Sequence, residues 1–231
     1  FQPFGLIVTL ILILPLLASV AIGFFTRDDG ELSAQLSIGA IVSSFVLSLV
    51  VFFWRPDVRL EFGLNWLDVG PLQVSFGLVI DELSVLMLLV VTGVGSLIHI
   101  FSLGYMKKDP GFARYFAFLS FFTFSMLGIV LASNLLLMFV FWELVGVSSY
   151  LLISFWFDKP AAADAGKKAF ITNRIGDFGF LFGIIIVWSG MGTLDFQELE
   201  MKLISNPVAM GAMATCAGLL LFCGAVGKSA Q

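Results

Sequence analysis

Long apolar segments dominate the sequence and determine the solvent in which it folds. Seven stretches reach the length of about 20 residues that a helix needs to cross a bilayer. They fall near 4–25, 33–54, 82–103, 115–132, 135–157, 166–189 and 208–230. Of the 231 residues, 59% are hydrophobic and 12% are charged, whereas soluble domains carry about twice that charged fraction. The sequence therefore predicts an all-α polytopic membrane protein with about seven transmembrane helices.

Residues 57–80 have a different pattern. Apolar side chains recur at every second position on both sides of Asp68–Gly70–Pro71, at Val58, Leu60, Phe62, Leu64, Leu72, Val74, Phe76 and Leu78. Period-two alternation broken by turn residues favours a β-hairpin outside the membrane over an irregular loop. We expect this hairpin to act in assembly, because its apolar positions need a partner surface.

The organisation of the chain is simple. No linker or low-complexity segment divides it, so we expect a single membrane domain over residues 1–231. The sequence begins with Phe1, and its last apolar run continues almost to Gln231. We therefore expect it to be a piece of a longer protein.

Basic residues are distributed unequally between alternate loops. The loops after the first, third and fifth spans hold Arg27, Lys107, Lys108, Arg114, Lys159, Lys167 and Lys168; those after the second, fourth and sixth hold Arg55, Arg59 and Lys202. Cytoplasmic loops carry the excess of Lys and Arg. We expect residues 104–114 and 158–168 to face the cytoplasm or its organellar equivalent, and the N-terminus and hairpin to face the opposite side.

Four ionisable residues lie inside the predicted spans: Glu143, Arg174, Asp177 and Lys228. Each costs roughly 2.5–3.5 kcal/mol at a helix centre if left unpaired, and such residues usually mark an ion or proton path. Arg174 and Asp177 are three residues apart on one helix face and could instead neutralise each other as a structural pair. Glu143 and Lys228 have no such partner on their own helices, so their partners must come from neighbouring helices.

Several other chemistries find no support in the sequence. There is no basic cluster for nucleic acid, no CxxC run for an iron–sulfur cluster and no glycine-rich nucleotide-binding motif. Cys216 and Cys223 are too far apart along one helix for a disulfide. The single histidine, His99, is interpreted as a hydrogen-bonding residue rather than a metal ligand or a proton relay. We expect no metal and no redox cofactor in this chain.

Four segments carry a family resemblance: 79–106 (VIDELSVLMLLVVTGVGSLIHIFSLGYM), 134–157, 167–183 and 224–231 (GAVGKSAQ). They resemble the antiporter-like subunit of respiratory complex I, which is called subunit L of NADH–quinone oxidoreductase in bacteria and subunit 5 in mitochondria, and which has a counterpart in the cyanobacterial and plastid complex. The resemblance begins near residue 79, and the preceding part matches only in plan. It implies an inverted-repeat antiporter-like fold, of which this sequence holds the leading helices and most of the first repeat.

The resemblance also implies roles for individual residues. Glu143 and Lys228 match the family's proton-transferring glutamate and lysine, and Asp177 and Arg174 match its supporting charges. NADH, FMN, iron–sulfur clusters and quinone are then expected in partner subunits. The implied partners are other membrane-arm subunits, especially a neighbouring antiporter-like subunit, and the lipid bilayer. We expect an energy-coupling membrane, in the first place the bacterial cytoplasmic (inner) membrane, with thylakoid and mitochondrial inner membranes as alternatives.

Three functional hypotheses follow from the residues and the resemblance. The first is a proton-translocating membrane-arm subunit of an NADH– or ferredoxin–quinone oxidoreductase, in which Glu143 sets the proton affinity of a buried Lys228. The second is the large subunit of an Mrp-type sodium/proton antiporter. The third is a structural membrane subunit that does not pump.

Overall fold

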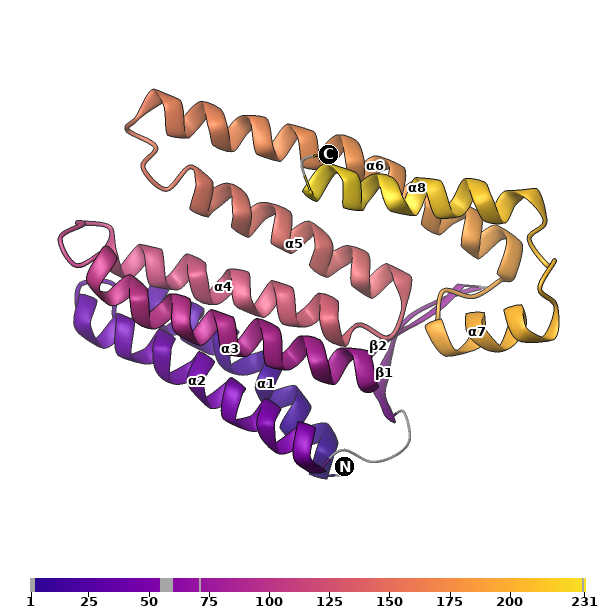
Figure 1. Ribbon diagram of the computed structural model, residues 1–231, viewed down its shortest axis with the longest axis horizontal. Coiled ribbons are helices and arrows are strands. Elements are labelled where there is room, and N and C mark those ends of the chain that lie inside the picture. The colour runs from indigo at the N-terminus through magenta and orange to yellow at the C-terminus, as the bar shows by residue number, and fades with distance from the viewer. Residues whose placement is uncertain (1–2, 55–59, 71, 230) are drawn as a thin grey trace. The chain divides into compact units, whose positions relative to one another are not determined.

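The computed structural model describes residues 3–54, 60–70, 72–229 and 231. Within these residues the chain forms helices and one two-stranded sheet (Figure 1). Their bounds are α1 Pro3–Phe24, α2 Gly30–Trp54, β1 Leu60–Val69, β2 Leu72–Ile80, α3 Glu82–Tyr105, α4 Phe112–Leu131, α5 Leu135–Ile153, α6 Pro160–Met191, α7 Phe196–Ser205 and α8 Ala212–Lys228. The expected start of the hairpin at 57–59 lies outside the described residues, and so do the loop residues Arg55 and Arg59.

The chain divides into two compact units. The first comprises Phe1–Phe62 and Leu78–Leu131, and thus contains α1 to α4. The second comprises Gly63–Gly77 and Ala132–Gln231, and thus contains most of the hairpin and α5 to α8.

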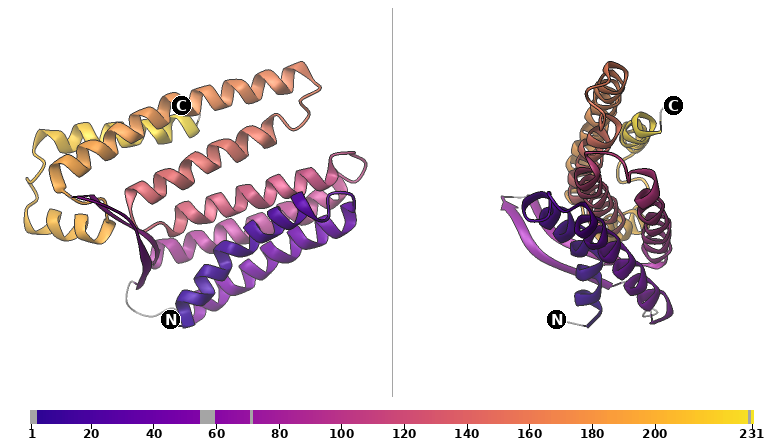
Figure 2. Two further views of the ribbon diagram at one scale, coloured as in Figure 1. Left: turned by 180° about the vertical axis from the view of Figure 1, so that it is seen from behind. Right: turned by 90° about the vertical axis from the view of Figure 1, so that its left-hand side faces the viewer.

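In the first unit, α1 packs against α2 and α4, and α3 packs against the same two helices (Figures 1 and 2). Small hydroxyl side chains lie between them. The Ser37 and Ser120 hydroxyls are 2.7 Å apart, and Ser44 Oγ donates to the Ile11 carbonyl at 3.1 Å. Small side chains let apolar helices approach closely, and their hydroxyl groups find partners across the contact.

An apolar core in the first unit joins the membrane helices to the ends of the hairpin. Its members are Val8, Ile11, Leu12, Val51, Leu78, Ile80, Val85, Leu88, Leu127 and Leu131. Directly after β2, Asp81 caps α3: its carboxylate accepts from the Ser84 backbone N–H, and the Ser84 hydroxyl accepts from the Asp81 backbone N–H. This capping box marks where the strand ends and the membrane helix begins.

In the second unit, α8 packs along α6 in the opposite direction, and glycines line the contact. A Cβ atom on Gly176 would lie 2.8 Å from the Cys223 carbonyl oxygen, and one on Gly183 would lie 2.8 Å from the Leu221 backbone nitrogen. The two backbones are therefore too close for any larger residue at these positions. Small residues at these positions allow the two helices to pack closely.

The described residues contain six helices long and apolar enough to cross a membrane, where the sequence predicted about seven. The seventh predicted span, 208–230, corresponds to α8, which has 17 residues and begins at Ala212. The later start has a local cause: Gly211 takes a left-handed φ of 50° before the first helical residue, which turns the chain. The sixth predicted span, 166–189, is a longer helix, because α6 runs from Pro160 to Met191 and ends at Gly192, its left-handed C-cap.

Helix α7 was not predicted from the sequence. Its residues FQELEMKLIS contain three charges, so they interrupt the apolar pattern instead of extending it. Asp195 caps the helix by accepting from the Gln197 and Glu198 backbone nitrogens, and the Lys202 ammonium donates to the Met191 carbonyl at the end of α6. A signal for this helix was present in the Asp195 and Glu198 spacing, which is typical of a helix start.

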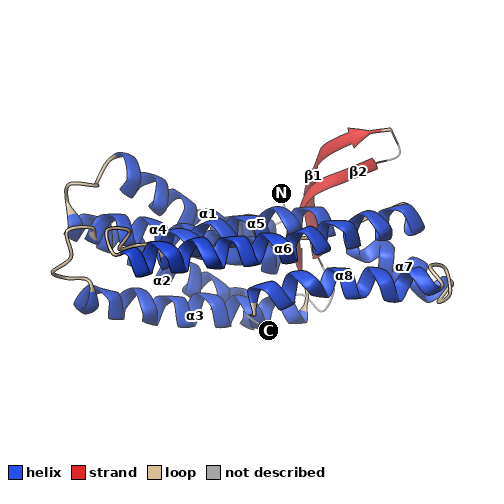
Figure 3. Cartoon of the chain, turned by 90° about the horizontal axis from the view of Figure 1, so that it is seen from above, coloured by secondary structure: helices blue, strands red, loops and turns tan. Residues whose placement is uncertain are grey.

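The predicted β-hairpin is confirmed (Figure 3). Gly70, at the turn, has a positive φ of 59°, which glycine adopts without steric cost. Farther along, Gly63 faces Gly77 across the two strands, and a Cβ atom on Gly63 would lie 3.0 Å from the Gly77 Cα atom. The strands thus approach closely at this point.

Candidate functional site

The Glu143 side chain lies near the middle of α5 and forms an ion pair with Arg174 of α6. In this chain the two side chains are 23% and 33% exposed. The Arg174 guanidinium also lies 4.6 Å from the centre of the Phe170 ring, one helical turn earlier on α6. Glu143 therefore has a partner from a neighbouring helix, as its isolation on α5 required.

Asp177 is the most deeply buried of the four charged residues, with 2% of its surface exposed. Its Oδ1 atom accepts a hydrogen bond of 2.8 Å from the indole N–H of Trp142 on α5. Its Oδ2 atom has no hydrogen-bond partner among the described residues. The carboxyl group also interacts electrostatically with Lys228 and Arg174.

Lys228 is the last residue of α8, and its ammonium donates to the backbone carbonyl of Trp142 at 2.9 Å. The same ammonium lies 5.6 Å from the centre of the Trp142 ring, within the range of a cation–π contact. The adjacent Gly227 packs on the Thr172 carbonyl and on Gly176, which are close to the middle of the 32-residue helix α6. Lys228 thus lies at the level of Arg174 and Asp177, because α8 runs back along α6 and ends halfway.

Gly146 has no side chain and so leaves room on α5 for the ends of the Lys228 and Arg174 side chains. A Cβ atom at this position would lie 3.0 Å from the Lys228 ammonium nitrogen and 3.8 Å from Nη2 of Arg174. Gly146 is three residues after Glu143 and thus on the same side of α5. A cation from α6 and a cation from α8 therefore both approach the face of α5 that carries Glu143.

The structure brings all four predicted site residues together, but the contacts differ from the simplest expectations. In the part of the chain that the structure describes, no ion pair joins Glu143 to Lys228, and none joins Arg174 to Asp177. The coupling of Glu143 to Lys228 therefore remains a prediction. Trp142, which touches both Asp177 and Lys228, was not singled out from the sequence, although an indole N–H inside an apolar span needs an acceptor.

His99 lies in the first unit, on the buried face of α3, with 1% of its surface exposed. Its Nδ1 atom is 2.8 Å from the Gly95 carbonyl, an atom that can only accept, so Nδ1 carries a proton. Its Nε2 atom has no hydrogen-bond partner among the described residues. His99 also lines a mainly apolar cavity of about 210 Å³ between α3 and α4. The bond to Gly95 agrees with the hydrogen-bonding role inferred for this residue.

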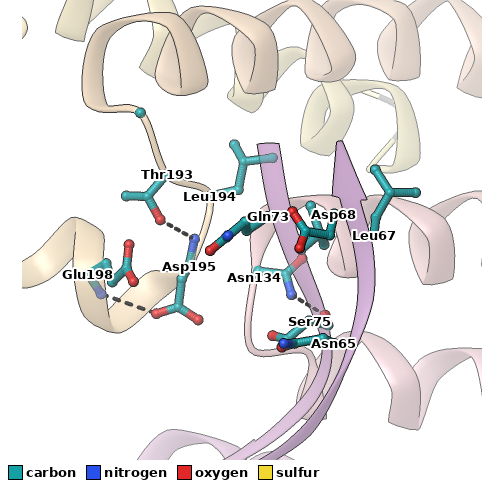
Figure 4. A pocket seen from close by; sticks show the side chains of 12 residues that line it. Asn65, Leu67, Asp68, Gln73, Ser75, Asn134, Thr193, Leu194, Asp195 and Glu198 are labelled. Atoms are coloured by element: carbon teal, nitrogen blue, oxygen red, sulfur yellow. Dashed lines mark hydrogen bonds between the residues drawn. The ribbon is translucent and has the colours of Figure 1, made fainter. Parts of the chain in front are cut away.

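A polar pocket of about 230 Å³ lies in the second unit, beside the hairpin (Figure 4). Its lining includes Asp68 of β1, Asn134 before α5, and Asp195 and Glu198 at the start of α7. The turn before α5 is tied to the turn before α7, because Leu135 N donates to the Leu194 carbonyl and Phe196 N donates to the Ser133 carbonyl. Since Asp195 caps α7, one of its oxygens is already occupied by backbone donors.

Two family models match this chain. Residues 66–116 match the model described as NADH-ubiquinone oxidoreductase (complex I), chain 5 N-terminus. Residues 132–231 match the model described as NADH:quinone oxidoreductase/Mrp antiporter, TM. The second match contains all four charged site residues.

Curated relatives agree with these matches. The chain is 40% identical over 234 residues to NAD(P)H-quinone oxidoreductase chain 5 of Synechocystis sp., covering 96% of this chain and 34% of that protein. It is 42% identical over 237 residues to chloroplastic subunit 5 of Zygnema circumcarinatum, covering 97% and 34%. It is 49% identical over 167 residues to NADH-quinone oxidoreductase subunit L of Mycobacterium tuberculosis, covering 72% and 26%. The chain thus spans about a third or less of the length of these relatives.

Two solved structures share the fold. One is the Mrp complex from Dietzia sp. DQ12-45-1b, with a TM-score of 0.82, 23% identity, and coverage of 97% of this chain and 24% of that one. The other is a membrane-bound sulfane sulfur reductase, described as an archaeal respiratory membrane complex, with a TM-score of 0.78, 19% identity, and coverage of 95% and 44%. At these identities the similarity concerns the fold alone.

Proposed function

Since the chain belongs to the family of membrane subunits shared by NADH:quinone oxidoreductases and Mrp antiporters, we propose that it is part of a proton-translocating subunit of a quinone oxidoreductase. In this proposal, quinone reduction takes place elsewhere in the complex, and the charges on α5, α6 and α8 move protons. The names of the relatives favour NADH or NAD(P)H as the electron donor of the whole complex.

The observation that carries the proposal is the meeting of four ionisable side chains at the centre of apolar helices. The Glu143–Arg174 ion pair supplies one carboxylate with a cation, and Lys228 interacts electrostatically with Asp177. Buried charges persist when they are paired, and removing one partner leaves the other uncompensated. A group of two acids and two bases therefore offers more than one way to distribute charge within one site.

The proposed proton step is a change of partner for Glu143. With Glu143 bound to Arg174, Lys228 is held by the Trp142 carbonyl and by the nearby Asp177. If the Glu143 carboxylate leaves Arg174 and approaches Lys228 through the space beside Gly146, it favours the charged ammonium. Its return to Arg174 withdraws that support. A proton is then loaded on Lys228 in one arrangement and released in the other.

We further propose that all electron carriers lie in partner subunits. An iron–sulfur cluster is usually held by four cysteine thiolates, and this chain has two cysteines, Cys216 and Cys223, on one helix. In this proposal NADH, FMN, the clusters and quinone belong to other subunits of the complex. The nearest partner we propose is a neighbouring antiporter-like subunit in the membrane arm.

The membrane is proposed to be an energy-coupling one, either the bacterial cytoplasmic membrane or a thylakoid or mitochondrial inner membrane. The loops at 104–114 and 158–168 would face its cytoplasmic, stromal or matrix side. The described helices agree with a multi-pass protein, since six of them meet the length and composition of membrane spans.

A sodium/proton antiporter is the second candidate function. The match over residues 132–231 is to a model that names both quinone oxidoreductases and Mrp antiporters, and one similar fold is that of an Mrp complex. Both classes use the same membrane fold, so the charged site alone does not separate them.

One experiment separates the candidates. The full-length protein is purified in its complex and reconstituted in sealed vesicles, and proton uptake is measured during quinone reduction with and without sodium. We expect proton uptake that depends on quinone reduction and not on sodium. Sodium-dependent proton exchange without quinone reductase activity would favour the antiporter, and quinone reduction that Lys228→Met leaves fully coupled would favour a structural role.

A further inference from the structure

Trp142 contacts two charged residues of the site, Asp177 on α6 and Lys228 on α8. Its indole N–H donates to Asp177 Oδ1 at 2.8 Å, and its backbone carbonyl accepts from the Lys228 ammonium at 2.9 Å. The same residue therefore contacts an acid from α6 and a base from α8. Of these two contacts, the one to Asp177 depends on the identity of the side chain, because any residue has a carbonyl group.

The Trp142 ring is held in place by neighbours. It packs edge-on against Phe180 with ring centroids 5.3 Å apart, and Phe139 packs edge-on against the same Phe180 at 5.7 Å. Phe139 is one helical turn before Trp142 on α5, and Phe180 is one turn after Asp177 on α6. This aromatic packing fixes the direction of the indole N–H, which a free side chain would not maintain.

Two neighbouring residues of α5, Trp142 and Glu143, contact different residues of α6. Successive residues of a helix point about 100° apart, so Trp142 and Glu143 reach different groups on α6: Trp142 binds Asp177, and Glu143 binds Arg174. Because Trp142 holds one oxygen of Asp177, the carboxyl group stays beside Lys228, with which it interacts electrostatically. Without the indole bond, neither Asp177 oxygen has a described hydrogen-bond donor.

We propose that Trp142 is a positioning residue that fixes Asp177 beside Lys228 and thereby prepares the lysine for proton transfer. This inference rests on the proposed proton-translocating function, and it adds to that function a residue with no titratable group. The charged groups that face Lys228 are then Asp177, held by Trp142, and Arg174, held by Glu143.

The test compares Trp142→Phe with the wild type in the full-length protein, assembled in its complex in sealed vesicles. Phenylalanine keeps an aromatic ring and the backbone carbonyl but has no N–H. We expect the rate of proton uptake to fall about tenfold, the loss typical of one hydrogen bond to a charged acceptor. Trp188→Phe is the matched control, because Trp188 packs in the apolar cluster of the second unit, eleven residues after Asp177 on α6. It should leave proton uptake unchanged.

The double variant Trp142→Phe/Asp177→Asn distinguishes positioning from general packing. If Trp142 acts through Asp177, the double variant should be no slower than Asp177→Asn alone, since residues that act as one unit are not additive. Losses that multiply, or Trp142→Phe behaving like Trp188→Phe, would overturn the inference. Absence of proton uptake in the wild type would instead count against the proposed function itself.

A second variant keeps the test informative if Trp142→Phe does not assemble. Phe180→Leu removes the ring that packs against the indole but leaves the N–H donor. We expect a smaller loss of proton uptake, and we expect this loss to disappear in the Asp177→Asn background. A loss of equal size in both backgrounds would contradict a role through Asp177.

Discussion

Glu143 and Arg174 form an ion pair between α5 and α6, and Arg174 also interacts electrostatically with Asp177 and Lys228. The pair occupies Glu143 in the arrangement seen here, and Lys228 is bound by the Trp142 carbonyl instead. The Glu143–Arg174 ion pair and the bond between Lys228 and the Trp142 carbonyl therefore lie at the same level of the helices. The proposed proton step needs Glu143 to exchange one cation for the other.

If Arg174 and Glu143 stabilise each other as an ion pair, the loss caused by removing Arg174 should be offset by also neutralising Glu143. Arg174→Ala should lower the yield of assembled complex, because it leaves a carboxylate inside an apolar span without its cation, at a cost of about 3–5 kcal/mol. The double variant Arg174→Ala/Glu143→Gln removes both charges and should recover most of that yield. Yield is measured by quantifying the purified complex from equal amounts of membrane.

A matched control comes from the surface pair Lys167–Asp164, whose side chains are 67% and 76% exposed. Lys167→Ala should leave the yield unchanged, because exposed pairs contribute about 0–1 kcal/mol. If the yield of the double variant is no higher than that of Arg174→Ala, Glu143 is not the group that Arg174 stabilises.

The close approach of α6 and α8 predicts that Gly183→Ala destabilises the second unit. An added Cβ atom would lie 2.8 Å from the Leu221 backbone nitrogen, so α8 has to shift. Overpacking of this kind costs about 1–3 kcal/mol, which should lower the midpoint of thermal unfolding. In Gly218→Ala the new Cβ atom has no neighbour within 4 Å in this chain, and the midpoint should not fall. Equal midpoints for the two variants would show that the glycine contact is not needed.

Asn134 attaches strand β2 of the hairpin to the start of α5 in the second unit. Its Oδ1 atom caps α5 by accepting from Leu137 N, and its Nδ2 atom donates to the Ser75 carbonyl of β2 at 2.8 Å. Asn134→Ala should remove both contacts and lower the complex yield, with about 1 kcal/mol lost from the cap alone. Asn134→Ser keeps a capping oxygen but is too short for the bond to Ser75, so its yield should be intermediate.

Proton uptake per assembled complex should stay normal in both Asn134 variants, because the hairpin is proposed to act in assembly. It can be measured on vesicles that contain equal amounts of complex. Normal yield with lost proton uptake would show that this region takes part in transport.

The sequence predicted the parts of the fold that depend on hydrophobicity and local pattern. The apolar runs of α1 to α6 and the alternation of β1 and β2 are strong local signals, and the structure confirms both classes of element. Helix α7 was missed because its charges break the apolar run. The start of α8 was placed too early because the turn at Gly211 depends on a backbone angle that composition does not reveal.

The sequence predicted which residues form the site, but not which of them contact one another. Four charges in apolar spans identify Glu143, Arg174, Asp177 and Lys228 without a structure, since each one is costly to bury alone. Which acid meets which base depends on how α5, α6 and α8 are staggered. The level of Lys228 illustrates this: it is close to the end of the predicted span 208–230, whereas α8 runs back along α6 and places it beside the middle of that helix.

Glu143 and Lys228 are proposed to act as one proton-transferring unit, and proton uptake per electron tests this coupling most directly. The measurement uses sealed vesicles that carry the full-length protein in its complex as Glu143→Gln, Lys228→Ala or the double variant. Glu143→Gln should impair uptake, Lys228→Ala should abolish the proton step of this site, and the double variant should be no worse than Lys228→Ala alone. Strictly additive losses, or normal uptake by Glu143→Gln, would contradict the coupling.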